Sequence, residues 1–377
     1  MITKDAILVL ENGEAFEGYA FGAKGDRVGE LVFQTGMSGY QETLTDPSYA
    51  GQIVVQTAPH IGNTGMNDAD EESRKIWVSG YVVKEVSIRP SNFRSQRTLE
   101  QDLVDSGVIG IAGLDTRALT RMIRESGAMR AGIFTKDGRG VGELLGLVKA
   151  SPEMSGQNLS AEVSTEQPYD LPATTKSIGS LAVLDLGIKR ATLLKLAEMG
   201  FDITVFPQTA SFEEIIRINP VGVFYSNGPG DPAASDAHVA LLQKVLTEKI
   251  PFFGICFGNQ LLGRALGFET YKLKYGHRGI NQPVLDKETG KIEVTAHNHG
   301  FAVDAPTDGV INSKNGFGRV EVSHVGLNDD CVEGLRCLDV PAFSVQYHPE
   351  AAAGPHDSTY LFDRFRNLVI ANGEQHA

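Results

Sequence analysis

Short apolar stretches alternate with helical patterns between residues 179 and 266, and this alternation limits the possible folds more than any other feature of the sequence. The apolar stretches are short enough to be buried strands, and they cover residues 181–185, 202–206, 221–225 and 251–255. The segments between them have helical spacing and cover residues 189–199, 211–218 and 235–247. Strands that alternate with helices predict a parallel sheet with helices on both faces, and ligands at the carboxyl ends of its strands.

The chain has 377 residues, which is enough for two domains, and its composition changes between them. Residues 151–178 are rich in Ser, Thr, Pro and Glu and lack apolar periodicity, so we expect a linker there. Residues 1–150 predict an N-terminal mixed α/β domain, with strands near 7–10, 31–33, 53–56 and 81–86 and helices near 98–106 and 116–126. Residues 179–377 predict an α/β domain with a parallel or mixed sheet, richer in strands from 269 to 346, and a last helix at 360–370.

Charge and composition exclude several classes of protein. The formal net charge of −13 argues against binding to nucleic acid, which needs clustered Lys and Arg. No apolar run approaches the roughly 20 residues that span a bilayer. The first residues lack the pattern of a signal peptide, so we expect a cytoplasmic protein without a membrane partner. The three cysteines form no C-x-x-C pair, which predicts neither a disulfide framework nor a structural zinc site.

The strongest chemical signal is the sequence Gly-Ile-Cys-Phe-Gly at residues 254–258, between an apolar strand and a helical run. This is the thiol version of a nucleophile elbow, a tight turn that needs glycines and exposes the side chain at its centre. The helix that follows favours the thiolate form of Cys256, and the Phe257 N–H can stabilise an oxyanion. The alternative is an inert cysteine buried after a core strand. The flanking glycines favour the nucleophile.

Two further segments can complete a thiol-dependent site. His348 and Glu350 follow a strand-like run and lie two residues apart, so they can share a face as a base and the group that orients it. By itself His348 could equally be an exposed histidine at a strand end. The loop Ser226–Pro232 follows the strand at 221–225 and can offer backbone N–H groups to a substrate, although such a composition is also common in plain surface turns.

The pair His297 and His299 forms a His-x-His pattern that could bind a metal ion. No third ligand with suitable spacing stands out in the sequence. We therefore expect no metal site in this chain.

The loop, the elbow and the His-Pro-Glu motif together resemble a class I, triad-type glutamine amidotransferase domain. Further segments resemble the small subunit of carbamoyl-phosphate synthases and extend the likeness over essentially the whole chain. These segments are residues 36–42, 44–49, 59–63, 67–72, 91–94, 114–117, 185–190 and 298–303.

The resemblance implies a flavodoxin-like C-terminal domain that hydrolyses L-glutamine to glutamate and ammonia through a thioester on Cys256. It assigns His348 and Glu350 to the rest of the triad. It also implies that the glutamine is bound by Ser48 of the N-terminal domain and by Gly228, Gly230, Phe257, Gln260, Asn298, Gly300 and Phe301. Asn259 and Arg278 depart from the family pattern, in which His is frequent at both positions, but neither belongs to the triad.

The resemblance further implies a partner. No Walker-type loop for ATP is present, so the ATP and its metal ions are expected on a separate large subunit. That subunit would make carbamoyl phosphate from bicarbonate and the ammonia released here, for arginine and pyrimidine biosynthesis, and the N-terminal domain would dock it. No cofactor is expected in this chain.

Two alternatives stay open at this point. One is a non-catalytic scaffolding subunit, which a missing triad residue would favour. The other is a stand-alone thiol hydrolase such as a peptidase or γ-glutamyl hydrolase, which would have no use for a docking domain.

Overall fold

The computed structural model describes residues 4–376, the side chains of the last two of these excepted, and it divides into two compact units. The first contains the chain up to Ser155 together with Lys274–Gly279. The second contains Gly156–Leu273 and the residues from Ile280 onward. Within residues 4–376 no helix combines the length and the apolar content that crossing a bilayer requires.

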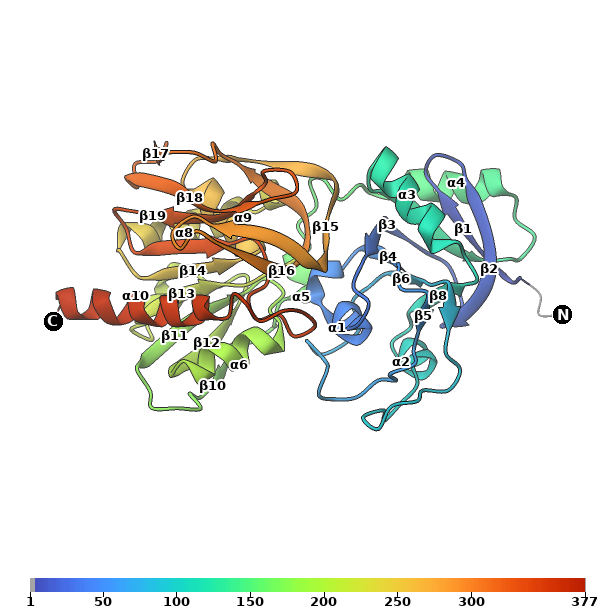
Figure 1. Cartoon of the computed structure of the whole chain (residues 1–377), viewed down its shortest axis with the longest axis horizontal. Helices are drawn as coiled ribbons and strands as arrows, with labels where there is room; N and C mark the ends of the chain where they lie inside the picture. Colours follow the sequence, from blue (N-terminus) through green and yellow to red (C-terminus); the bar gives the residue numbers. More distant parts are fainter. Residues whose placement is uncertain (1–3, 377) are drawn as a thin grey trace. The chain divides into compact units, whose positions relative to one another are not determined.

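The first unit is built on a closed barrel, which Figure 1 shows in blue and cyan. Its strands follow one another around the barrel in the order β1 (Ala6–Leu10), β2 (Ala15–Gly22), β8 (Ile109–Ala112), β6 (Gly80–Val82), β4 (Gln52–Gln56), β3 (Arg27–Gln34) and β9 (Met129–Thr135), and β9 pairs back to β1. Closure leaves the barrel without an exposed edge strand.

Strand β1 shows how alternation builds this unit. Ala6, Leu8 and Leu10 pack in one cluster with apolar residues of the other barrel strands. Ile7 and Val9 point to the opposite face, where they pack against helix α4 (Val141–Ala150). The remaining helices and short strands are α1 (Tyr40–Thr45), η1 (Pro47–Tyr49), β5 (His60–Ile61), β7 (Glu85–Val86), α2 (Leu99–Asp105) and α3 (Thr116–Ser126).

The predicted elements of this unit are present, with one correction. The single strand predicted at residues 81–86 is wrong, because β6 and β7 are separate strands there. β6 pairs with β4 and β8 in the barrel, whereas β7 pairs only with β5 in a sheet of two strands. The chain therefore leaves the barrel between them, at Val83 and Lys84.

The second unit contains one large mixed sheet. Its strands lie in the order β10 (Tyr169–Leu171), β12 (Phe201–Pro207), β11 (Gly179–Asp185), β13 (Gly222–Tyr225), β14 (Phe252–Ile255), β20 (Ala342–Val345), β19 (Val332–Cys337), β18 (Arg319–Gly326), β15 (Glu269–Asp286) and β16 (Lys291–Asp304), and β17 (Val310–Asn312) pairs with β18. The five strands from β12 to β20 are parallel, and β19 and β18 continue the sheet antiparallel. This confirms the predicted α/β fold with a parallel or mixed sheet.

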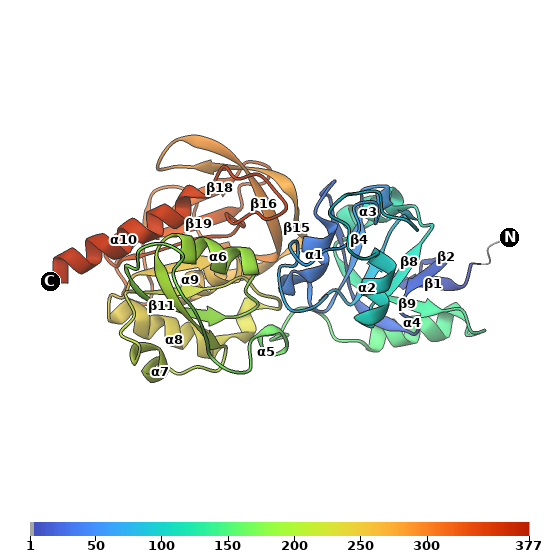
Figure 2. The ribbon, with the colours of Figure 1, turned by 90° about the horizontal axis from the view of Figure 1, so that it is seen from below.

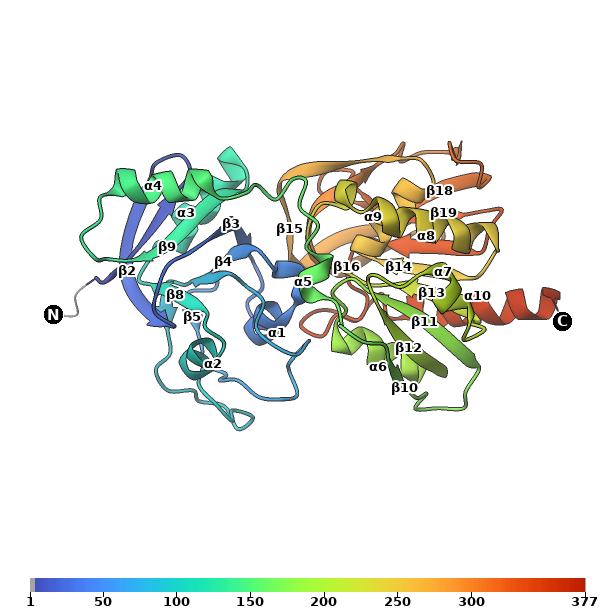
Figure 3. The same cartoon turned by 180° about the vertical axis from the view of Figure 1, so that it is seen from behind.

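Helices cover both faces of the parallel strands. Helices α6 (Arg190–Glu198) and α10 (Tyr360–His376) pack on one face through an apolar cluster that includes Leu196 and Phe365. Helices α7 (Phe212–Ile216), α8 (Asp236–Thr247) and α9 (Phe257–Ala265) pack on the other face. Figure 1 shows α10 in front of the strands, Figure 3 shows α7, α8 and α9 from behind, and Figure 2 shows α8 and α10 on opposite sides.

The segment predicted as a linker, residues 151–178, contains the short helix α5 (Ser160–Val163) and strand β10. β10 pairs antiparallel with β12, and Asn158 forms an isolated bridge with Gly230. The part of this segment from Gly156 onward is therefore attached to the second unit along much of its length. The limits predicted for the domains stay a prediction.

Phe253 tests the packing of the second unit, because its ring stacks on Phe343 with centroids 4.4 Å apart and also contacts Phe224 and Phe365. Its side chain is fully buried. We expect Phe253→Ala to lower the free energy of unfolding by about 3–5 kcal/mol, because it removes a core ring and leaves a cavity. Urea unfolding followed by circular dichroism measures this. Ile292→Ala is the control, since Ile292 is 63% exposed and its loss should cost less than about 0.5 kcal/mol. Equal effects of the two changes would contradict this account of the core.

Candidate active site

Cys256 occupies the sharp turn between strand β14 and helix α9. Its φ is 55° and its ψ is −98°, a conformation that residues with a side chain rarely adopt. The Cys256 N–H donates to the Val345 carbonyl at 2.8 Å, so the pairing of β14 with β20 continues into the turn. The surrounding structure therefore holds this residue in a strained backbone, as is common at functional sites.

The two glycines around Cys256 are needed because other backbone groups lie against them. A Cβ at Gly254 would lie 2.7 Å from the carbonyl of Gly258, and a Cβ at Gly258 would lie 2.5 Å from the Tyr225 carbonyl oxygen. Both distances are too short for any side chain. The G-x-C-x-G pattern therefore has a steric cause, which supports the elbow predicted from the sequence.

The thiol of Cys256 is buried and its surroundings are polar on one side. Its Sγ lies 3.6 Å from the carbonyl oxygen of Asn298, to which it can donate. Cys256 is also the N-cap of α9, whose first N–H groups have no acceptor within the helix. The partial positive charge at this helix end favours the thiolate. The Phe257 N–H belongs to the same first turn.

His348 lies at the same edge of the sheet as Cys256. β14 and β20 are adjacent and parallel with Ile255 opposite Val345, and His348 follows β20 by three residues. The His348 N–H donates to the Ala296 carbonyl of β16 at 2.9 Å, which fixes the backbone there. The imidazole is buried, and Glu350 Oε1 lies 2.8 Å from its Nδ1. The pair predicted from spacing two residues apart is thus in contact.

The protonation of His348 follows from this contact. A carboxylate only accepts hydrogen bonds, so Nδ1 carries a proton and donates to Glu350. Within residues 4–376, the Nε2 atom of His348 has no hydrogen-bond partner. Nε2 is therefore the atom that can exchange a proton with a thiol or a substrate.

Lys189 contacts the candidate triad, and the sequence reasoning did not assign it. Its Nζ lies 2.8 Å from Glu350 Oε1, and both side chains are buried. Burial by itself raises the pKa of Glu350, but the charges of Lys189 and His348 outweigh this and hold that pKa well below its usual range. Glu350 is therefore a carboxylate at neutral pH, and Lys189 is one reason for it.

Asp185 holds the loop that presents Lys189. Its Oδ1 accepts hydrogen bonds from the N–H groups of Gly187 and Ile188 at 2.9 and 2.8 Å. Lys189 then forms the N-cap of α6. Residues 185–190 are part of the family resemblance, but nothing in their pattern shows which distant side chain Lys189 contacts.

The glycine-rich loop after β13 lies close against two other segments of the second unit. A Cβ at Gly228 would lie 2.1 Å from the Leu186 carbonyl oxygen. Gly230 has a φ of 96°, and a Cβ there would lie 2.7 Å from the Gln157 carbonyl oxygen. Both glycines are therefore required by the backbone around them. Contact with glutamine, predicted for both, stays a prediction.

Strand β16 and helix α9 bring most of the other predicted glutamine-binding residues together. Gln260 on α9 donates from Nε2 to the Phe301 carbonyl at 2.8 Å. Asn298, Gly300 and Phe301 are on β16, and Asn298 contacts the thiol through its carbonyl. Gln260 therefore links the helix that follows Cys256 to β16, and the role of these residues in binding glutamine stays a prediction.

Asn259 has a structural role. Its side chain is fully buried, accepts a hydrogen bond from Ser344 Oγ at 2.8 Å and donates to Gln346 Oε1 at 3.1 Å. It therefore ties α9 to β20 and to the segment just after it. This explains how an amide can stand where related sequences often have His.

Ser48 and Arg278 belong to the first unit. Ser48 lies in η1, where its N–H donates to Asp46 Oδ1 at 2.9 Å. Arg278 is buried and donates from Nη1 to the Tyr275 carbonyl at 2.8 Å. The predicted contact of Ser48 with the substrate stays a prediction.

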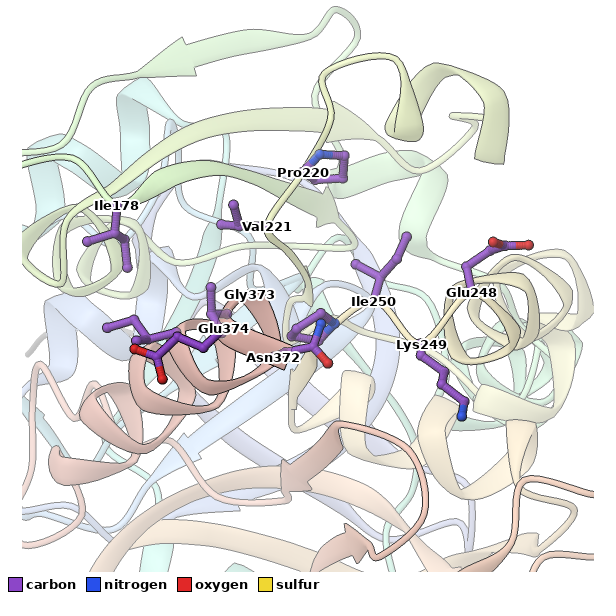
Figure 4. A pocket seen from close by; sticks show the side chains of 12 residues that line it. Ile178, Pro220, Val221, Glu248, Lys249, Ile250, Asn372, Gly373 and Glu374 are labelled. Carbon is purple, nitrogen blue, oxygen red and sulfur yellow. The ribbon is translucent and has the colours of Figure 1, made fainter. Parts of the chain in front are cut away.

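A groove of about 460 Å³ lies elsewhere in the second unit. Figure 4 shows Pro220 and Val221, which precede β13, and Lys249 and Ile250, which precede β14, along its wall. The groove is thus at the amino ends of the parallel strands. Cys256 and His348 follow the carboxyl ends, so this groove is separate from the candidate active site.

The sequence model of the carbamoyl-phosphate synthase small chain, CPSase domain, matches residues 8–133, and that of class-I glutamine amidotransferases matches residues 182–368. The carbamoyl phosphate synthase small chain of Streptomyces avermitilis is 62% identical over 365 residues, which are 97% of this chain and 96% of the relative.

Two further small chains are similar over their whole length. That of Bifidobacterium longum strain NCC 2705 is 55% identical over 388 residues, with 98% of this chain and 95% of the relative covered. That of Mycobacterium tuberculosis strain H37Rv is 53% identical over 375 residues, with 98% of this chain and 99% of the relative covered. The chain therefore belongs to the carbamoyl phosphate synthase small chain family.

Proposed function

We propose that this chain is the glutaminase subunit of a carbamoyl phosphate synthase and that Cys256 is its nucleophile. The observation that carries the proposal is the buried His348–Glu350 hydrogen bond at the sheet edge where Cys256 ends the neighbouring strand. Family membership alone would also fit a subunit that has lost activity. A complete thiol, imidazole and carboxylate at one edge favours an active one.

In the first half of the proposed reaction, His348 Nε2 accepts the proton of the Cys256 thiol, and the resulting thiolate attacks the side-chain amide carbon of glutamine. The C–S bond forms and the carbonyl oxygen becomes an oxyanion. When this intermediate collapses, the C–N bond breaks and His348 Nε2 gives its proton to the departing nitrogen. The products are ammonia and a γ-glutamyl thioester on Cys256.

In the second half, His348 accepts a proton from water, and the hydroxide attacks the thioester carbon. The C–S bond then breaks, His348 Nε2 returns its proton to Cys256 Sγ, and glutamate leaves. Glu350 accepts from His348 Nδ1 throughout, and it stabilises the imidazolium that forms in each half. The N–H groups of Phe257 and Gly228 are the proposed donors to the oxyanion.

The proposed partner is a large subunit that uses the ammonia, bicarbonate and ATP to make carbamoyl phosphate. The relatives are named small chains, which implies such a partner. We infer that the first unit serves to dock it, since a free hydrolase would not need this unit. The ATP, with its metal ions, is then bound by the partner, and the ammonia passes to it internally.

The nucleophile is tested by Cys256→Ser in the assembled enzyme. A hydroxyl is a much weaker nucleophile than a thiolate at neutral pH, so glutamine-dependent synthesis of carbamoyl phosphate should fall by at least about 1,000-fold. Synthesis from added ammonia should remain near that of the unchanged enzyme. Both rates are measured with the same preparation.

The matched control is Cys331→Ser. Cys331 is also buried, but burial and the neighbouring acids Glu333 and Asp329 raise the pKa of its thiol above the usual range, which disfavours the thiolate. This change should leave the glutamine-dependent rate close to normal. Retained glutamine-dependent synthesis in Cys256→Ser would overturn the proposed mechanism.

Lys189 gives a second test, through the pH dependence of the reaction. Its charge lowers the pKa of Glu350, so Lys189→Met should raise that pKa. Glu350 then becomes protonated at a higher pH, and a neutral acid no longer stabilises the imidazolium. We expect kcat/KM for glutamine to fall about 10-fold at neutral pH, and the acid limb of its pH profile to move to higher pH.

Lys195→Met is the control for this change. Lys195 lies on the same helix α6 but is partly exposed and pairs with Glu198. Its loss should change neither the rate nor the pH profile. A Lys189→Met enzyme with a lower rate and an unmoved acid limb would show that Lys189 supports the fold without acting on Glu350.

A further inference from the structure

A second cluster of polar side chains is buried on β16, next to the residue whose carbonyl contacts Cys256. His297 and His299 lie two residues apart and so share one face of the strand, and the backbone carbonyl of Asn298 between them lies 3.6 Å from Cys256 Sγ. Glu333 on β19 reaches the two histidines and is fully buried.

The hydrogen bonds around the two imidazoles fix their protonation. The Thr295 hydroxyl donates to the Gln282 carbonyl at 2.8 Å, so it accepts from His297 Nε2, which lies 2.7 Å away. The Phe301 carbonyl can only accept, so His299 donates to it from Nδ1 at 2.9 Å. In the neutral rings the lone pairs are therefore on His297 Nδ1 and His299 Nε2.

These two nitrogen atoms and a carboxylate oxygen converge. His297 Nδ1 lies 3.2 Å from His299 Nε2, and Glu333 Oε1 lies 3.7 Å and 3.9 Å from them. Three atoms that all offer electron pairs repel one another in a buried site. A positive charge between them would turn this repulsion into attraction.

The spacing fits a metal ion. The point equidistant from the three atoms lies about 2.1 Å from each, which is the length of a Zn–N or Zn–O bond. Each histidine also donates its other ring N–H to an oxygen, the arrangement that usually orients metal-binding imidazoles. Two histidines and one glutamate are a known ligand set for zinc, with a fourth position for another ligand.

We propose that His297 Nδ1, His299 Nε2 and Glu333 Oε1 bind a divalent transition-metal ion, with Zn²⁺ the best match. The sequence predicts no metal here because it shows no third ligand near the histidine pair. Glu333 comes from a later strand, and only the fold brings it to them. The competing explanation for the cluster is a proton that makes one imidazole cationic, and the experiment separates the two.

The proposed ion has a positioning role. The Phe301 carbonyl accepts from His299 Nδ1 and also from Gln260 Nε2, at 2.9 and 2.8 Å. Asn298, whose carbonyl faces the thiol, lies between the two metal ligands in the chain. An ion that ties β16 to β19 would therefore hold the strand that lies beside Cys256, without itself contacting the thiol.

The test measures zinc binding to the full chain carrying Cys256→Ser, so that the reactive thiol cannot bind the metal. The protein is stripped with a chelator, and Zn²⁺ is titrated in competition with a chromophoric chelator. We expect one Zn²⁺ per chain with a dissociation constant below about 1 μM. Adding Glu333→Gln or His297→Gln should weaken binding by more than about 100-fold, because each removes a ligand atom.

His60→Gln is the matched control, because His60 is an exposed histidine that also lies 3.7 Å from a carboxylate, that of Glu85. It should bind zinc as its parent does. Thermal unfolding gives a second readout, since an ion that binds only the folded state raises Tm. Zinc should raise Tm for the parent and for His60→Gln, but not for Glu333→Gln or His297→Gln.

Two results would overturn the proposal. One is a folded parent that binds no stoichiometric zinc, which would leave the shared proton as the explanation of the cluster. The other is zinc binding that is unchanged in both ligand variants, which would place the metal elsewhere. Because the parent alone decides the first result, the test does not depend on whether the variants fold.

Discussion

The pairing of β14 with β20 is the interaction on which the candidate site depends. These strands are far apart in the sequence, and their parallel register sets Ile255 opposite Val345. The Cys256 N–H then bonds to the Val345 carbonyl, which fixes the elbow and brings the segment with His348 to the same edge. A shift of one residue would turn alternate side chains to the opposite face, so this register decides whether the thiol and the imidazole can work together.

Two buried carboxylates lie near this edge, and each contacts nitrogen atoms of other side chains. Glu350 contacts Lys189 and His348, and their charges outweigh the cost of burying it. Glu333 lies beside two imidazoles whose other nitrogen atoms are already engaged as donors. The first carboxylate contacts a lysine and an imidazole. The second lies with two imidazole nitrogen atoms at distances that fit a metal ion, and this geometry motivates the zinc proposal.

The sequence predicted the second unit better than the first. Its strands read as continuous apolar runs because helices bury both faces, and each predicted strand from 181 to 255 lies within two residues of the observed one. The barrel was harder to predict. β2 is half exposed and contains Gly18 and Gly22, and α4 contains Gly142 and Gly146, so neither has a strong pattern.

Cys256, His348 and Glu350 could be predicted from the sequence because their motifs are local. Lys189 and Glu333 could not, because they acquire their roles only through contacts between distant segments.

Strand β16 shows how one backbone can serve two sites. The side chains of His297 and His299 share one face and lie near Glu333, whereas the backbone carbonyl of Asn298 between them lies beside the thiol. The two clusters are therefore joined by a single peptide segment. A change that moves one histidine also moves the peptide groups next to it, and those groups border Cys256. The position of the Asn298 carbonyl therefore depends on what holds the two histidines on either side of it.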